Sequence, residues 1–246
     1  MIELQGEAFG TMHQTFGGDT LNTAVYLARS GAPLGVHARY ATGLGDDRYS
    51  DEMLRRWQLE GVATDLVRRL PGRVPGLYTI SVDERGERTF TYWRESSAAR
   101  GYFDVPETPL EQAADALTAL YFSGISLAIL TPTARERLFE TARRVRAHGG
   151  RVIFDNNYRP RLWASAEDAR ACYQQFVELA SIALVTLDDE QLLYGDASLA
   201  ESRARSLAAP CDEVVIKQGG GPVLVRLPRL CLVSMVLTLG RALSQP

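Results

Sequence analysis

The sequence predicts an α/β protein built on a mostly parallel β-sheet that helices cover on both faces. Helix and strand patterns alternate along most of the 246 residues, and the strand candidates of the second half are short apolar runs. Such alternation is typical of parallel strands joined by crossover helices, whose strands are buried. Hydrophobic residues make up 46% of the chain, which is enough for a core.

The first half of the chain combines two helix patterns with three strand patterns. Gly31 and Gly61 end the two helix patterns, as glycine commonly does. A loop with a glycine near its end joins the last two strand patterns, which predicts a β-hairpin. In chain order we expect a helix over 20–30, a strand over 35–40, a helix over 47–60, and strands over 76–82 and 88–93.

From Pro109 onwards the order is helix, strand, helix, strand. Ligands of parallel sheets bind at the C-terminal ends of the strands, so the residues that follow Asp155, Val185 and Lys217 are candidates for a site. We expect strands over 117–122, 151–155, 182–185, 212–217 and 223–226, and helices over 132–147, over 166–180 and from Asp188.

The composition favours a cytoplasmic protein whose main partner is neither nucleic acid nor a membrane. The net charge is −3 and 23% of the residues are charged, so we expect neither nucleic acid nor an anionic membrane as partner. The longest apolar run, 230–239, is shorter than the about 20 residues that span a bilayer, and no signal peptide is evident. The scattered Cys172, Cys211 and Cys231 indicate unpaired thiols in a reducing compartment.

The most informative segment is Gly17-Gly18-Asp19-Thr20-Leu21-Asn22, which runs into a helix pattern. Two glycines let the backbone approach a ligand closely. The polar side chains that follow can bind hydroxyl groups, and the start of a helix offers backbone N–H groups. An ordinary turn with a helix cap explains the same residues, and this segment alone leaves both interpretations open.

Three further segments carry polar residues in a recognisable order. They are the Gly-x-Gly-Asp turn at 42–47, the aromatic segment Phe90-Thr91-Tyr92-Trp93-Arg94-Glu95 of the expected hairpin, and the polar cluster 154–163. Taken separately, the aromatic segment is also explained by simple packing of its rings. An arginine after a strand is also explained as a charged side chain in solvent. The combination of the four segments favours a ligand site.

These segments resemble the PfkB (ribokinase-like) family of carbohydrate kinases over residues 1–226. Within that family the chain is most similar to the branch that acts on the sugar acid 2-keto-3-deoxygluconate. The resemblance implies a ribokinase-like three-layer α/β sandwich with a small β-sheet lid, whose inserted strands lie at about 5–17 and 65–100. Lid strands of this family commonly pair between subunits, so a homo-oligomer is expected. Residues 227–246 form a tail outside the family pattern.

The resemblance also implies residue roles on the substrate side. Two arginines suit a carboxylate, which arginine grips bidentately, whereas a neutral sugar would not need both. Gly18, Asp19, Thr20, Leu21 and Asn22 would hold the sugar hydroxyls, Tyr78 and Tyr92 would line the lid side, and Arg94 and Arg159 would face the carboxylate.

The implied cofactors are ATP and Mg²⁺, and the implied reaction moves the γ-phosphoryl group of ATP to the C6 hydroxyl. Glu190 would help to hold Mg²⁺ through water, although Leu187 stands where the family usually has an asparagine. Asn157, Tyr158 and Arg159 would border the nucleotide phosphates, and Lys217, Gly219, Gly220 and Gly221 would lie along ATP.

The implied catalytic base has no counterpart. The family uses the aspartate of a Gly-Ala-Gly-Asp motif, but no Asp or Glu follows Arg226. We therefore assign no catalytic residue, and expect a chain that is C-terminally truncated or frameshifted near residue 226, with the C-terminal part of the fold missing and with impaired or no activity. The start also resembles a family strand that is clipped before Met1. An apolar tail is an aggregation hazard, so poor solubility is expected.

Two alternatives stay open. The chain could be another PfkB sugar kinase such as a fructokinase, or a sugar-acid binding module that has lost its chemistry. A nicotinamide-dependent enzyme has little support because the Gly-x-Gly-x-x-Gly spacing is absent.

Overall fold

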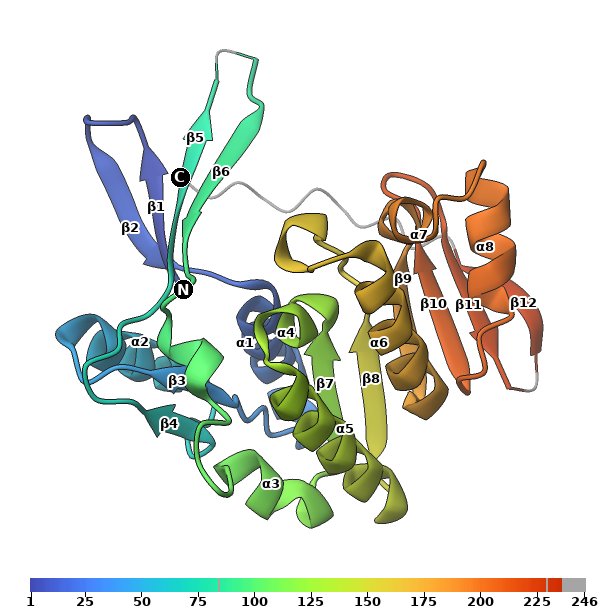
Figure 1. Cartoon of the computed structure of the whole chain (residues 1–246), viewed down its shortest axis with the longest axis horizontal. Helices are drawn as coiled ribbons and strands as arrows, with labels where there is room; N and C mark the ends of the chain where they lie inside the picture. Colours follow the sequence, from blue (N-terminus) through green and yellow to red (C-terminus); the bar gives the residue numbers. More distant parts are fainter. Residues whose placement is uncertain (84, 229, 236–246) are drawn as a thin grey trace. The chain divides into compact units, whose positions relative to one another are not determined.

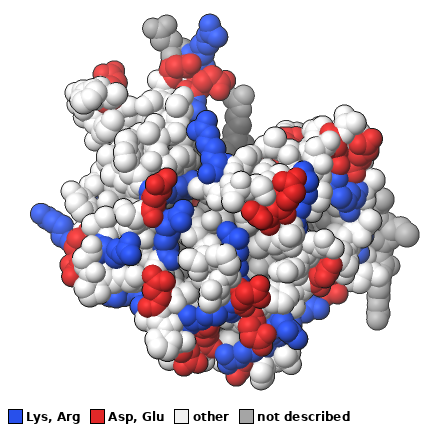
Figure 2. All heavy atoms as spheres, viewed as in Figure 1, with Lys and Arg blue, Asp and Glu red and all other residues white. Residues whose placement is uncertain are grey.

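A computed structural model describes residues 1–83, 85–228 and 230–235. The chain divides into two compact units, Met1–Ala113 and Ala114–Pro246 (Figure 1). Basic and acidic side chains are interspersed on the face in Figure 2, where neither sign forms a continuous patch. None of the helices in the described residues is both long and apolar enough to cross a lipid bilayer.

The first unit contains a four-stranded sheet in the order β2-β1-β5-β6. The strand β1 pairs antiparallel with β2 and parallel with β5, and the predicted hairpin of β5 and β6 is confirmed (Figure 1). The four strands are β1 (Ile2–Gly6), β2 (Met12–Phe16), β5 (Leu77–Val82) and β6 (Arg88–Trp93).

Two amphipathic helices form the core of the first unit with parts of this sheet. Leu21, Val25 and Trp57 are nearly or fully buried, and the Trp57 ring lies edge-on to Tyr40 with 5.3 Å between centroids. Asp47 begins the second helix, because its carboxylate accepts hydrogen bonds from two backbone N–H groups. The remaining elements are α1 (Asp19–Gly31), η1 (Ala32–Leu34), β3 (Thr42–Leu44), α2 (Arg48–Leu59), β4 (Val67–Arg69), η2 (Ala98–Gly101) and α3 (Pro109–Ala113).

The predicted strand over 35–40 is wrong. The chain turns there, with Gly35 at φ +75° and its N–H donating to the carbonyl of Ala32. The N–H of Val36 donates to the carbonyl of Gly31, and Arg39 makes an isolated bridge to Ala63. The backbone groups at the start of this segment therefore bond locally, which leaves the apolar pattern without a ladder.

The second unit contains a six-stranded sheet in the order β12-β11-β10-β9-β8-β7. The four strands from β7 to β10 are parallel, as predicted, and β11 and β12 extend the sheet antiparallel. The strands are β7 (Ala119–Ser123), β8 (Arg151–Asp155), β9 (Ile182–Thr186), β10 (Glu213–Lys217), β11 (Val223–Leu227) and β12 (Leu230–Met235).

Crossover helices connect these parallel strands and pack on the sheet. Phe154 of β8 lies edge-on to Tyr173 of α6 at 5.1 Å, and Phe122 of β7 lies 4.9 Å from Phe176 of α6. Right-handed crossovers, the usual hand, place such helices on one face, and Figure 1 shows α5 and α6 over β7 and β8. The helices are α4 (Gly124–Ile129), α5 (Pro132–Ala147), α6 (Ala166–Leu179), α7 (Leu187–Tyr194) and α8 (Leu199–Leu207), with the short turns η3 (Ala114–Ala116) and η4 (Pro160–Leu162).

The predicted domain division stays a prediction. The strands β1, β2, β5 and β6 overlap the ranges expected for the lid. Of the tail 227–246, the residues 229 and 236–246 lie outside the described residues.

Candidate active site

The Gly-Gly-Asp-Thr-Leu-Asn segment begins α1. Gly18 is the N-cap at φ +142°, a conformation that favours glycine, and its carbonyl accepts from the N–H of Asn22 at 2.8 Å. The hydroxyls of Thr20 and Tyr40 are hydrogen-bonded at 2.9 Å. Leu21 points into the core with 1% exposure, so it can serve a ligand only through its backbone.

Gly17 has a steric reason to be glycine. A Cβ there would lie 2.2 Å from the Tyr78 hydroxyl and 2.8 Å from Oε2 of Glu3. Glu3 and Tyr78 are register partners on β1 and β5, and the Tyr78 hydroxyl donates to the Glu3 carboxylate. Burial, and then this hydrogen bond, raise the pKa of Tyr78. Its proton is therefore held by Glu3, and its oxygen can accept a bond from a ligand.

Tyr78, Phe90, Tyr92 and Arg94 form one contact group, the lid cluster. The rings of Tyr78 and Tyr92 lie 5.7 Å apart, and those of Phe90 and Tyr92 are stacked at 6.3 Å. The Arg94 guanidinium lies 4.2 Å above the Tyr92 ring, a cation–π contact that stabilises by about 0.5–2 kcal/mol. The structure thus brings together Tyr78, Tyr92 and Arg94, three of the residues expected on the substrate side.

Asn22 is not part of the lid cluster. It borders a groove of about 470 Å³ between β2, α1 and α2, together with Thr15, Phe16, Val25, Tyr26, Arg29, Arg56, Leu59 and Glu60. Its role toward the sugar therefore stays a prediction.

In the second unit, Asn156 organises the end of β8. Its side-chain oxygen accepts from the N–H groups of Asn157 and Thr186, and its Nδ2 donates to the Thr186 carbonyl and to Glu190. It is 3% exposed, so these bonds satisfy a buried amide. The next residue, Asn157, has φ +29°, a conformation uncommon outside glycine. Asn156 thus fixes the backbone that leads into Asn157, Tyr158 and Arg159.

Arg159 is paired with an acidic residue. Its Nη1 lies 3.1 Å from both carboxylate oxygens of Asp189 and donates to the Tyr158 carbonyl at 2.6 Å. Burial raises the pKa of Asp189, and Arg159 opposes that shift. Among residues 1–83, 85–228 and 230–235 these contacts engage only Nη1, so Nε and Nη2 can bind an anion.

Lys217, at the end of β10, reaches across β9 to Asp155, at the end of β8. Its Nζ lies 3.0 Å from both carboxylate oxygens, and Tyr121 donates to the same carboxylate at 3.4 Å. In the glycine-rich turn that follows, a Cβ on Gly219 or Gly220 would meet nothing within 4 Å. A ligand can therefore approach the backbone of this turn closely.

Glu190 is the candidate for contact with a metal. Its Oε2 accepts from Asn156 at 3.2 Å and its Oε1 from Arg205 at 3.4 Å; burial raises its pKa, and both partners oppose the shift. No group of three or more His, Cys, Asp or Glu able to hold a metal occurs in the described part of the chain. A carboxylate has about four acceptor positions, so Glu190 can still bind water. It fits a Mg²⁺ that nucleotide phosphates carry, since this ion keeps most of its waters.

Sequence reasoning missed the partners of the predicted residues. Glu3, Asp189 and Arg205 lie in none of the four motif segments, and Asp155 lies in the polar cluster 154–163 without an expected role of its own. The only available signal was the position of Asp155 and Lys217 at strand ends. The predicted residues come together as Tyr78, Tyr92 and Arg94 in the first unit, and as Asn157, Tyr158 and Arg159 in the second.

The chain is similar to known carbohydrate kinases. The model of the pfkB family carbohydrate kinases matches residues 3–227. The 2-dehydro-3-deoxygluconokinase of Dickeya dadantii is 47% identical over 228 residues, which are 92% of this chain and 73% of that protein. The enzyme of the same name from Escherichia coli K12 is 48% identical over 229 residues, 92% of this chain and 74% of that protein.

Two solved structures have a similar fold. The 2-dehydro-3-deoxygluconokinase of Thermotoga maritima has a TM-score of 0.77 at 23% identity, over 92% of this chain and 74% of that one. The aminoimidazole riboside kinase of Salmonella enterica, in complex with its riboside and an ATP analogue, has a TM-score of 0.76 at 25% identity, over 96% and 73%.

The fold and the family match together define an α/β carbohydrate kinase of the ribokinase-like class. The chain belongs to the PfkB family of carbohydrate kinases. The expected fold class and family are thereby confirmed.

Proposed function

We propose that this chain is an ATP-dependent kinase for 2-dehydro-3-deoxygluconate, another name for 2-keto-3-deoxygluconate, which it phosphorylates at the C6 hydroxyl. The observation that carries this proposal is the Arg94 guanidinium fixed 4.2 Å above the Tyr92 ring, beside Tyr78. A sugar acid offers a carboxylate for the cation and carbon-bound hydrogens for the rings. A neutral sugar has no negative charge to pair with the cation.

The relatives support an acidic substrate. Those from Dickeya, Escherichia and Haemophilus, 42–48% identical, are all named 2-dehydro-3-deoxygluconokinase. Fructokinases are 27–29% identical over smaller or similar shares of the chain. The fructokinase alternative is therefore the weaker one.

On the substrate side, we assign the sugar hydroxyls to the segment Gly18–Asn22, the apolar face of the sugar to Tyr78 and Tyr92, and the carboxylate to Arg94 and Arg159. Tyr78 acts as an acceptor toward a sugar hydroxyl because its proton is bound by Glu3. Arg159 keeps Nε and Nη2 for the carboxylate or for a phosphate oxygen while Asp189 holds Nη1.

The second substrate is ATP with its Mg²⁺. We assign its phosphates to Asn157, Tyr158, Arg159 and Lys217. The backbone of Gly219, Gly220 and Gly221 lies along the bound ATP. Glu190 contacts the Mg²⁺ through water. Phosphoryl transfer relies on positioning and on neutralisation of charge on the phosphoryl oxygens, which these cations provide.

The base that takes the C6 proton is not assigned. The acidic residues of the second-unit site are already paired, Asp155 with Lys217, Asp189 with Arg159 and Glu190 with Arg205. Residues 227–246 contain no carboxylate side chain. We therefore expect the 246-residue polypeptide to bind both substrates and to turn over slowly, because base catalysis contributes about 10²–10⁴-fold. A cytoplasmic location and a homo-oligomer through the lid strands belong to the same proposal.

The test is phosphoryl transfer from ATP labelled in its γ-phosphoryl group, with mass spectrometry of the sugar. We expect label on C6 of 2-dehydro-3-deoxygluconate, above a protein-free blank. Label on fructose in its place would favour the alternative kinase. Tight binding of the sugar acid without any labelled product would favour the binding module.

A further inference from the structure

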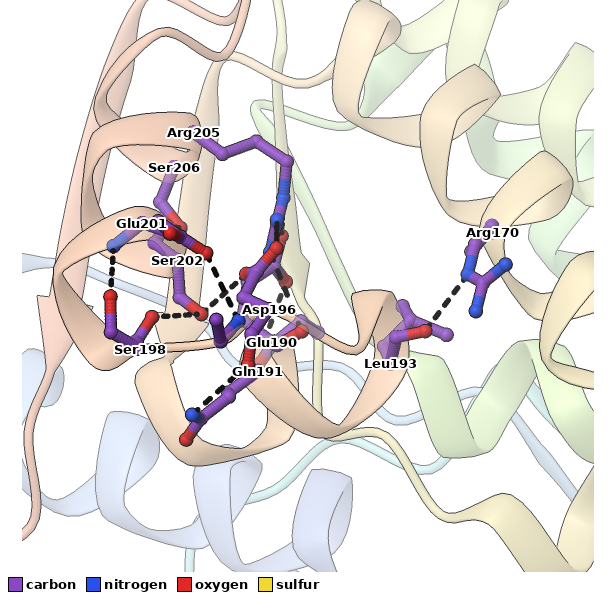
Figure 3. A network of polar contacts seen from close by, with 12 residues as sticks. Arg170, Glu190, Gln191, Leu193, Asp196, Ser198, Glu201, Ser202, Arg205 and Ser206 are labelled. Carbon is purple, nitrogen blue, oxygen red and sulfur yellow. Dashed lines mark hydrogen bonds and ion pairs between the residues drawn. The ribbon is translucent and has the colours of Figure 1, made fainter.

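Arg205 of α8 is held on three sides in the second unit (Figure 3). Its Nε lies 3.4 Å from Oε1 of Glu190, and its Nη2 donates to the Glu190 carbonyl at 3.4 Å. Its Nη1 donates to Asp196, and its guanidinium lies 3.8 Å above the Tyr194 ring. Long side chains lose rotamer freedom in such a setting, so this arginine has a fixed geometry.

Asp196 is fixed as well. Its carboxylate accepts from the hydroxyl of Ser202 at 2.5 Å, and Ser202 is fully buried in α8 (Figure 3). Arg205 therefore joins one anchored carboxylate, Asp196, to a second one, Glu190.

On its other oxygen Glu190 meets Asn156, which holds the start of the Asn157–Arg159 segment. A continuous set of contacts thus runs from Asp196 through Arg205 and Glu190 to Asn156. Among the described residues each oxygen of Glu190 has one hydrogen-bond partner, Asn156 directly after β8 and Arg205 on α8. Neither partner alone fixes the orientation of the carboxylate.

We propose that Arg205 is a positioning residue that fixes the Glu190 carboxylate and thereby sets how strongly the nucleotide site retains Mg²⁺. This inference rests on the proposed function, because it needs a Mg²⁺–nucleotide complex at this site. Arg205 touches neither the nucleotide nor the metal in this account. Groups that orient the residues around a metal typically change its affinity by 10–100-fold.

The test is titration of a fluorescent ATP analogue at a series of Mg²⁺ concentrations and in EDTA. For Arg205→Met we expect the half-saturating Mg²⁺ concentration to rise about tenfold, with the affinity in EDTA within about twofold of the unchanged chain. Arg205→Lys keeps the charge but reaches fewer acceptors, so we expect an intermediate shift. Arg205→Lys also tests the inference if the Arg205→Met variant fails to fold. Glu190→Gln should raise the half-saturating Mg²⁺ concentration by a similar factor. The double variant Glu190→Gln/Arg205→Met should differ little from Glu190→Gln alone, because both changes remove the same interaction.

Arg170→Met is the matched control. Arg170, on α6, donates at 2.8 Å to the carbonyl of Leu193 in α7, the helix that also carries Glu190. It does not contact Glu190 in the described structure (Figure 3). We expect its Mg²⁺ curve to be unchanged. An unchanged or leftward curve for Arg205→Met, or equal losses with and without Mg²⁺, would overturn the inference. Absence of nucleotide binding by the unchanged chain would contradict the proposed function itself, and the inference with it.

Discussion

Lys217 lies with its Nζ 3.0 Å from both carboxylate oxygens of Asp155, and it is the only lysine among 27 lysine and arginine residues. The pair joins the C-terminal ends of β10 and β8 across β9. Ligands of parallel sheets bind at this edge. A compact, strongly hydrated ammonium can turn from a carboxylate to a phosphate more readily than a planar guanidinium.

Nucleotide binding should protect Lys217 from acylation. Because the chain has one lysine, an amine-directed reagent modifies a single side chain, and the α-amino group serves as internal reference. We expect ATP with Mg²⁺ to slow acylation of Lys217 several-fold relative to that reference, measured by peptide mass spectrometry.

Lys217→Met should weaken nucleotide binding by about tenfold, which is 1.4 kcal/mol, the size of one charge-assisted hydrogen bond. The matched control is Arg151→Met, since Arg151 pairs with Glu213 at 2.7 Å across the same two strands at their opposite ends. Equal losses for both variants would contradict a nucleotide role for Lys217.

Loss of Arg94 should weaken binding of the sugar acid. For Arg94→Gln we expect a roughly 10- to 100-fold loss by calorimetry, because a charge-assisted hydrogen bond to the carboxylate stabilises by about 1.5–3 kcal/mol. Arg88→Gln, at the exposed start of the strand β6 that Arg94 directly follows, should leave the affinity unchanged. The assignment is wrong if Arg94→Gln binds the sugar acid as the unchanged chain does.

Gly17→Ala should destabilise the first unit. Its Cβ would meet the Tyr78 hydroxyl at 2.2 Å, so a buried tyrosine must move, at a cost of about 1–3 kcal/mol in the free energy of unfolding. Urea denaturation measures the change, and Tyr78→Phe, which removes the hydroxyl, should recover part of it. Gly220→Ala is the control, because its Cβ meets nothing within 4 Å. A Gly17→Ala chain of unaltered stability would contradict the packing described here.

Glu3→Ala should affect the sugar through Tyr78. Without its acceptor the Tyr78 hydroxyl can rotate, so we expect weaker sugar-acid binding, by about fivefold or about 1 kcal/mol. The double variant with Tyr78→Phe should lose little more than Tyr78→Phe alone, because both changes remove one interaction. Additive losses would show that Glu3 acts independently of Tyr78.

Much of the fold follows from the sequence because local and tertiary preferences agree. The strand β8 has the predicted limits, 151–155, and Phe154 within it packs on α6. The helix α2 begins at the predicted place because Asp47 caps it. The strand predicted over 35–40 is wrong because Gly35 adopts a positive φ and turns the chain. The pattern of apolar residues does not reveal that turn.

The candidate site was only half predictable. Residues whose types suit a ligand, such as Arg94 and Lys217, stand out in the sequence. Their partners do not, because Asp155 and Lys217 are 62 positions apart and Glu3 and Tyr78 are 75 apart. Such contacts depend on strand order and register, which local patterns do not encode.

The most direct measurement is a calorimetric titration of the unchanged chain with 2-dehydro-3-deoxygluconate and, separately, with fructose, both in the presence of a non-hydrolysable ATP analogue and Mg²⁺. We expect the sugar acid to bind at least about tenfold more tightly than fructose, because fructose has no carboxylate to engage the arginines. Equal affinities, or tighter binding of fructose, would contradict it.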